Sequence, residues 1–148
     1  MGYLPGSVEE KKEVFETPYK NIIAELVEGD QPYKRIIHTH QLEFNTTSYI
    51  RGITIDNAVV IVDEMQNLNF HELDSVMTRI GENCRVIFCG DYHQSDFKEG
   101  GEREGIIKFM RIVEQLKNFT TITFGWDDIV RSDFLRDYIM TKEMLGIR

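Results

Sequence analysis

The feature that most constrains the fold is the apolar run from Ala58 to Val62, which has no polar residue on either face of an extended strand. Four of its five residues are β-branched, and β-branched residues favour strands. A second run of the same type, Val86–Cys89, follows further along the chain. Strands that are apolar on both faces are typical of parallel sheets covered by helices on both sides. The two runs therefore predict a central parallel sheet.

A helix is predicted between these two runs. Asn69 is suited to cap its N-terminus, and Gly81 lies where a helix stop is expected. Between them, apolar residues recur at helical spacing and form one stripe, which consists of Phe70, Leu73, Val76, Met77 and Ile80. A strand, a helix and a second strand make up the unit from which parallel α/β sheets are built.

The C-terminal part of the chain repeats this alternation. A helical stripe contains Ile106, Phe109, Met110, Val113 and Leu116. Residues Thr120–Phe124 are predicted to form a third strand, and a last helix is predicted to begin near Ser132. The stretch Lys98–Gly105 carries three Gly residues among charges and predicts a mobile loop. The whole pattern predicts an α/β fold.

The N-terminal part is predicted to contain one or two helices between residues 8 and 28, with start signals at Ser7 and Thr17. Two short apolar stretches follow, Ile36-Ile37 and Leu42–Phe44, and are typical of short strands or connectors. A length of 148 residues predicts one domain, residues 1–148.

Composition excludes several classes of protein. The net charge of −8 argues against a surface that mainly covers nucleic acid, although a local basic groove is compatible with it. The sequence has neither an apolar run long enough to span a membrane nor the layout of a signal peptide, so we expect a cytoplasmic protein without a membrane partner. Cys84 and Cys89 are expected to be reduced thiols in that compartment.

Acidic residues follow both central strands and indicate a site. Asp63-Glu64 comes directly after the first run, and Gly90-Asp91 directly after the second. In parallel α/β sheets ligands bind outside the carboxyl ends of the strands, where we expect Asp63, Glu64, Asp91 and Gln94 to converge. An apolar strand that ends in Asp-Glu is the Walker B arrangement, in which Asp orients magnesium and Glu polarises the attacking water. The alternative is that the acids simply begin a solvated loop.

The neighbouring residues favour the first interpretation. Asp63-Glu64-Met65-Gln66 followed by Gly90-Asp91-x-x-Gln94 resembles motifs II and III of superfamily 1 helicases, and the wider sequence resembles the PhoH-like family of P-loop ATPases. The supporting segments occur in the family's order and roughly its spacing: Gly2–Gly6 with Glu10-Lys11, Tyr49–Gly52, Val60–Asn67, Thr78–Gly81 and Asp128–Arg131. The resemblance covers nearly the whole chain and implies a P-loop NTPase core of the RecA or helicase type.

The resemblance also implies roles for individual residues, with ATP and Mg²⁺ as the ligands. Asp63 would orient magnesium through its water shell, and Glu64 would be the catalytic base. Gln66 and Gln94 would sense the γ-phosphate, and Arg131 would approach the phosphates and stabilise charge that develops during transfer. Asp91 and Arg51 would contact the nucleotide. Arg131 has the alternative of an ion pair with Asp127 or Asp128, and Arg51 that of bracing a loop or contacting nucleic acid.

One element of the family is missing from the sequence. No Gly-x-x-x-x-Gly-Lys-Ser/Thr occurs in the 148 residues, and the nearest imitation, Gly100 to Gly105, lacks the Lys and the hydroxyl that hold phosphates and magnesium. We therefore expect a partial domain without the Walker A strand and helix, inactive when isolated. It should self-associate or bind a separate segment that carries Walker A, and RNA or DNA is a possible further partner.

Three other functions are open at this point. The chain could be a non-catalytic interaction module that retains the ATPase fold, or a metal-dependent nuclease that uses Asp63, Glu64 and Asp91. A metal centre is also conceivable, because two His residues are spaced to share one strand face and two others lie near the acids: His38, His40, His71 and His93.

Overall fold

The computed structural model describes residues 8–47, 50, 52–91 and 100–147. It divides the chain into two compact units, Met1–Gly52 and Ile53–Arg148. The expectation of a single domain stays a prediction, and the two units are described separately below.

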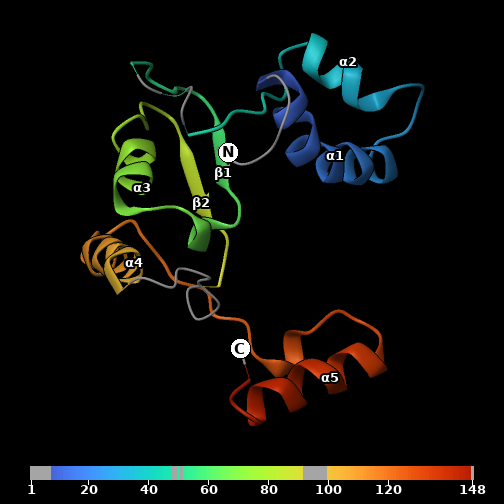
Figure 1. Ribbon diagram of the computed structural model, residues 1–148. Helices are drawn as coiled ribbons and strands as arrows, with labels where there is room; N and C mark the ends of the chain where they lie inside the picture. The colour runs from blue at the N-terminus through green and yellow to red at the C-terminus, as the bar shows by residue number, and fades with distance from the viewer. Residues whose placement is uncertain (1–7, 48–49, 51, 92–99, 148) are drawn as a thin grey trace. The chain divides into compact units, whose positions relative to one another are not determined.

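The first unit contains two helices, α1 (Val8–Leu26) and α2 (Pro32–His38) (Figure 1). The helical prediction for residues 8–28 is confirmed, but Thr17 is not a helix start, because α1 continues through Pro18. The Thr17 hydroxyl instead donates a hydrogen bond to the carbonyl of Glu13, one turn earlier. A proline ring removes one backbone donor and locally crowds the preceding turn, which a long helix tolerates at a cost of about 3 kcal/mol.

The strand prediction for Ile36-Ile37 is wrong, since both residues lie in α2. Pro32 occupies the first turn of that helix, where its missing N–H is not needed and its fixed φ angle favours the helical conformation. Leu42–Phe44 is also not a strand, although the Phe44 ring packs against Tyr19 with ring centroids 5.4 Å apart. Within the same unit, the Tyr33 hydroxyl donates a hydrogen bond to the Glu16 carboxylate.

The second unit contains a parallel two-stranded sheet, formed by β1 (Val59–Val62) and β2 (Arg85–Phe88) (Figure 1). The register pairs Val59 with Arg85 and Val62 with Phe88. Helix α3 (Phe70–Met77) connects the two strands, and Asn69 caps it as predicted. The Asn69 side chain accepts the N–H of Glu72, and the Glu72 carboxylate accepts the N–H of Asn69. The predicted parallel α/β arrangement is confirmed for this unit.

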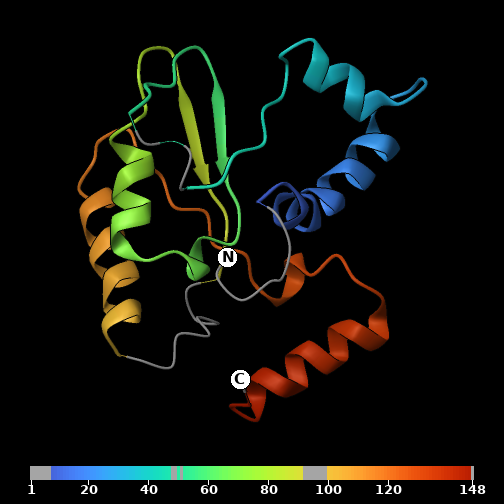
Figure 2. The ribbon, with the colours of Figure 1, turned by 45° about the horizontal axis from the view of Figure 1, so that its top comes forward.

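Two helices pack together beside the strands. Figures 1 and 2 show α3 and α4 (Gly100–Val113) on the same side of β1 and β2. The core between these elements is apolar and consists of Val62, Leu73, Val76, Ile106, Phe109 and Val113. The Phe88 ring of β2 contacts the Phe109 ring of α4 at a centroid distance of 5.0 Å. The helices approach closely because Gly105 has no side chain, and a Cβ there would lie 3.2 Å from the backbone N of Phe70.

The other face of the sheet is exposed and mostly apolar, with Arg85, the partner of Val59, as its charged residue. Val59, Ile61 and Ile87 lie on it and are 63%, 64% and 42% exposed. The sequence predicts cover on both faces, and within the structure as described these three side chains are not covered. Helices α3 and α4 cover one face of the sheet, and the exposed face is apolar except at Arg85.

The C-terminal part differs from the predictions in two places. Thr120–Phe124 does not form a strand, and Ile122 and Phe124 are largely exposed. A strand needs a neighbouring strand to satisfy its backbone hydrogen bonds, and composition alone does not provide one. The predicted loop up to Gly105 is helical from Gly100 onward, while Lys98 and Glu99 lie outside the described residues. A short 3₁₀ helix, η2 (Trp126–Asp128), follows, and α5 (Asp133–Met144) begins after Ser132 as predicted.

Candidate active site

The carboxyl ends of β1 and β2 bring the predicted acids to one edge of the sheet. Parallel pairing places Asp63-Glu64 and Gly90-Asp91 directly after neighbouring strand ends. Two backbone hydrogen bonds extend the pairing beyond the strands: Cys89 donates to Val62 at 2.8 Å, and Met65 donates to Cys89 at 2.9 Å. The predicted convergence is confirmed for Asp63, Glu64 and Asp91. Gln94 lies outside the described residues.

A tight turn at Glu64 projects the two carboxylates. Glu64 adopts the left-handed conformation, with φ 52° and ψ 41°, which residues other than Gly, Asn and Asp adopt rarely. An oxygen of the Asp63 carboxylate accepts the N–H of Glu64 at 2.9 Å and holds this conformation. The chain then forms the 3₁₀ helix η1 (Met65–Asn67), anchored by Met65, which is only 6% exposed. The buried Met65 side chain therefore anchors the turn in the core, while the side chains of Asp63 and Glu64 are exposed to solvent.

The Glu64 carboxylate has two amide neighbours. The side-chain NH₂ of Gln66 donates to it at 2.5 Å, and that of Asn67 lies at 3.5 Å from the same oxygen. These two amides restrict where the Glu64 carboxylate can lie, and a general base must lie within hydrogen-bond reach of the proton that it accepts. The arrangement thus presents a hydrogen-bonded, solvent-facing carboxylate at the end of a buried strand.

The Gln66 side chain also reaches the end of β2. Its carbonyl oxygen accepts the backbone N–H of Asp91 at 3.2 Å. Gly90 makes this approach possible, because a Cβ at that position would lie 2.3 Å from the Gln66 oxygen and 3.0 Å from the backbone N of Met65. The sequence suggested a motif at Gly90 but not its physical reason, since the register that brings residues 66 and 90 together is not visible in the sequence.

Cys89 is a neighbour of the site that the sequence analysis did not assign to it. Burial raises the pKa of its thiol, and the negative charge of Asp63 raises it further. The thiol is therefore held in its neutral form beside Asp63. Its position as the last residue of the second apolar run, directly before Gly90-Asp91, is the signal that could have identified it.

The residues at this edge suit magnesium better than a metal bound by protein ligands alone. Carboxylate oxygens are hard ligands, and magnesium commonly takes one or two carboxylates while it keeps water and substrate phosphates as its other ligands. Among the residues that the structure describes, no group of three His, Cys, Asp or Glu side chains lies close enough to hold a metal ion. His93 lies outside those residues.

The remaining predicted residues are less informative. Arg51 is outside the described residues. Arg131 is exposed in a bend between η2 and α5, and the contacts of the Glu64 carboxylate described above, with Gln66 and Asn67, do not involve it. Its two acidic neighbours are engaged elsewhere: Asp127 pairs with Arg136 at 3.3 Å, and Asp128 accepts the N–H of Gly125 at 2.7 Å.

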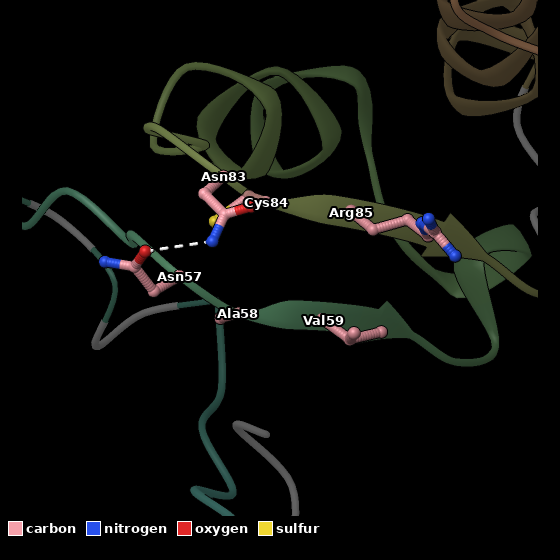
Figure 3. A pocket seen from close by; sticks show the side chains of 6 residues that line it. All are labelled: Asn57, Ala58, Val59, Asn83, Cys84 and Arg85. Atoms are coloured by element: carbon pink, nitrogen blue, oxygen red, sulfur yellow. Dashed lines mark hydrogen bonds between the residues drawn. The ribbon is translucent and has the colours of Figure 1, made fainter.

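A hollow of about 320 Å³ lies at the opposite end of the strands (Figure 3). It is lined by residues that precede or begin β1 and β2: Asn57, Ala58, Val59, Asn83, Cys84 and Arg85. The Asn83 amide donates to the Asn57 side chain at 3.0 Å, between two of these lining residues (Figure 3). Because ligands of parallel sheets bind at the carboxyl ends, this hollow is separate from the candidate site.

No helix among the described residues combines the length and the apolar character needed to cross a membrane.

Comparison with known proteins shows which family the sequence matches. A family model described as PhoH-like protein matches residues 1–142. The chain is 33% identical over 133 residues to Protein PhoH of Escherichia coli strain K12, which covers 89% of this chain and 37% of that protein. It is 28% identical to a PhoH-like protein of Bacillus subtilis and 27% identical to one of Synechocystis, over 88% and 97% of this chain. The chain spans 37% to 43% of the length of these three relatives.

Proposed function

Because the chain belongs to the PhoH-like family, we propose that it carries the magnesium-orienting and hydrolytic half of an ATP site. The observation that supports this best is the shared carboxyl edge of β1 and β2, where Asp63-Glu64 lies beside Gly90-Asp91. A P-loop NTPase needs its acids at such an edge, next to the strand that ends in the motif III segment.

In this proposal each residue has one role. Asp63 orients magnesium through water, and Glu64 accepts a proton from the water that attacks the γ-phosphate. Gln66 and Gln94 sense the γ-phosphate, Arg131 stabilises charge that develops on it, and Asp91 and Arg51 contact the nucleotide. Magnesium, when bound, would neutralise charge on the β- and γ-phosphates.

The phosphate-binding loop has to come from another segment. The sequence contains no Gly-x-x-x-x-Gly-Lys-Ser/Thr, so the backbone N–H groups and the Lys that offset the desolvation of phosphates are not provided by these 148 residues. We therefore expect these residues alone to bind ATP weakly and to hydrolyse none. A segment with the Walker A strand and helix would complete the site.

Coupling to RNA or DNA is part of the proposal but has less support. The net charge of −8 leaves room only for a local contact with nucleic acid. Trp126, a residue able to stack on a base, donates its indole N–H to Glu143 of α5 at 2.5 Å, which favours a packing role for this ring.

The test is phosphate release from MgATP by the chain, before and after addition of a Walker A segment taken from a PhoH-like relative. Hydrolysis should appear only in the mixture. Glu64→Gln should abolish turnover and leave nucleotide binding, measured by calorimetry, largely intact, because the substitution removes the base but keeps Asp63 for magnesium. Hydrolysis by the mixture that survives Glu64→Gln would refute the assignment of the base.

A second candidate function is a non-catalytic interaction module, and the exposed apolar face with Val59, Ile61 and Ile87 favours it. Light scattering of the isolated chain separates the two candidates together with the hydrolysis assay. If the Walker A segment reverses self-association and the mixture hydrolyses ATP, the result supports the ATPase. Stable association without hydrolysis in any mixture supports the module.

A further inference from the structure

Gln66 connects the two loops that form the candidate site. Its NH₂ group donates to the Glu64 carboxylate at 2.5 Å, and its carbonyl oxygen accepts the N–H of Asp91 at 3.2 Å. Both polar ends of one amide are therefore occupied, one by the loop after β1 and the other by the loop after β2.

The chemistry of the two neighbours fixes the orientation of this amide. The Asp91 N–H is a donor, so it pairs with the amide oxygen, and the Glu64 carboxylate oxygen accepts, so it pairs with the NH₂ group. No other uncharged side chain of this length offers an acceptor and a donor at its tip. A carboxylate at position 66 would keep the acceptor but repel Glu64, and a thioether would fill the space without either hydrogen bond.

The backbone is built around the same contact. Gly90 leaves room for the Gln66 oxygen, which would lie 2.3 Å from a Cβ at that position. Met65, directly before Gln66, is buried and donates its N–H to Cys89, directly before Gly90. Gln66 thus projects from a fixed point on one loop to a fixed point on the other.

We propose that Gln66 is a positioning residue for Glu64. This inference rests on the function proposed above. An exposed Glu side chain samples several rotamers, whereas a general base has to lie within hydrogen-bond reach of the water that it deprotonates. The hydrogen bond from Gln66 restricts the Glu64 carboxylate to the edge of the sheet beside Asp91. An NH₂ group carries two hydrogens, so Gln66 can donate one to Glu64 and the other to a γ-phosphate oxygen, and nucleotide binding and the placement of the base are then coupled through this side chain.

The first experiment measures amide hydrogen exchange of Asp91 by NMR in the full 148-residue chain without nucleotide. Gln66→Met should speed exchange of the Asp91 amide about fivefold, the effect of losing one hydrogen bond of ordinary strength. Gln66→Glu should keep the protection, because it keeps the acceptor. Asn67→Ala is the control, since Asn67 contacts Glu64 but not Asp91, and it should leave the Asp91 rate unchanged. An Asp91 rate that is the same in wild type and Gln66→Met overturns the proposal.

The second experiment measures ATP hydrolysis by the mixture with the Walker A segment. Both Gln66→Met and Gln66→Glu should lower kcat about tenfold or more and leave KM nearly unchanged, because each removes the donor to Glu64. A raised KM with unchanged kcat would make Gln66 a nucleotide-binding residue and overturn the positioning role. If the wild-type mixture does not hydrolyse ATP, the proposed function fails while the exchange experiment still decides whether the connection exists. If Gln66→Met does not fold, Gln66→Ala, which also removes the acceptor, should speed exchange of the Asp91 amide in the same way, and the kcat of Gln66→Glu still tests the donor to Glu64.

Discussion

Replacement of Gly90 by Ala tests the close contact on which the candidate site depends. The new Cβ would lie 2.3 Å from the Gln66 oxygen, 2.8 Å from Cγ of Met65 and 3.0 Å from the backbone N of Met65. The Gln66 side chain can rotate away, but it then loses its hydrogen bond with Asp91. The backbone of Met65 cannot move as easily, because its N–H is bonded to the carbonyl of Cys89 at 2.9 Å and its side chain is buried.

These two consequences give the size of the expected effect. Strain from a methyl group forced into a packed position is about 1–3 kcal/mol. Loss of one partly buried hydrogen bond adds about 0.5–1.5 kcal/mol. Gly90→Ala should therefore lower the free energy of unfolding by about 2–4 kcal/mol. With a urea dependence of about 2 kcal/mol/M, the unfolding midpoint should fall by about 1–2 M, measured by circular dichroism.

Gly125→Ala is the matched control. Its backbone φ of −111° suits any residue, and the nearest atom to its added Cβ is a carboxylate oxygen of Asp128 at 4.0 Å. Its midpoint should stay close to that of wild type. The double variant Gly90→Ala with Gln66→Ala should recover part of the loss, because the contact at 2.3 Å is relieved while the one with Met65 remains. A Gly90→Ala midpoint equal to that of the Gly125→Ala control would refute the close approach of the two loops.

Two further predictions concern titrating groups. In a Cys84→Ser background, Asp63→Asn should speed alkylation of Cys89 at pH 8 to 9, because the charge of Asp63 adds to burial in raising the pKa of that thiol. Equal rates would refute this electrostatic effect, and burial should keep both rates below that of the unfolded chain. Burial and the nearby Glu16 raise the pKa of Tyr33 above that of an unfolded tyrosine, which is about 10. Above about pH 10 the unfolded chain therefore loses this proton while the folded chain keeps it. The contribution of Tyr33 to stability is complete below about pH 10 and is lost as the pH rises further. The urea midpoint of wild type should therefore fall more steeply between pH 9.5 and 11 than that of Tyr33→Phe, and parallel curves would contradict this reasoning.

The parts of the fold that the sequence predicts correctly have strong local signals. The strand β1 follows from a run of β-branched residues, and the start of α3 follows from Asn69 with Glu72 three residues later. The shared edge of Asp63 and Asp91 follows from the rule that consecutive parallel strands end on the same side.

The parts that fail depend on contacts between distant segments. Ile36-Ile37 is too short to distinguish a strand from a helix, and Pro32 reads equally well as a stop or as a first helical residue. Residues 120–124 have strand-like composition but no ladder in the structure as described. The link from Gln66 to Asp91 requires the register of two strands, which no local pattern contains.

The backbone at Glu64 has a consequence for protein engineering. Because the left-handed conformation costs a Glu about 1 kcal/mol more than a Gly, substitution of Glu64 by Gly is a change that a screen for thermal stability would select. Such a screen would report an improved protein from which the proposed base has been removed. Stabilised variants of this chain should therefore be selected with position 64 held constant, and a gain in melting temperature that maps to this position should be taken as a warning of lost activity.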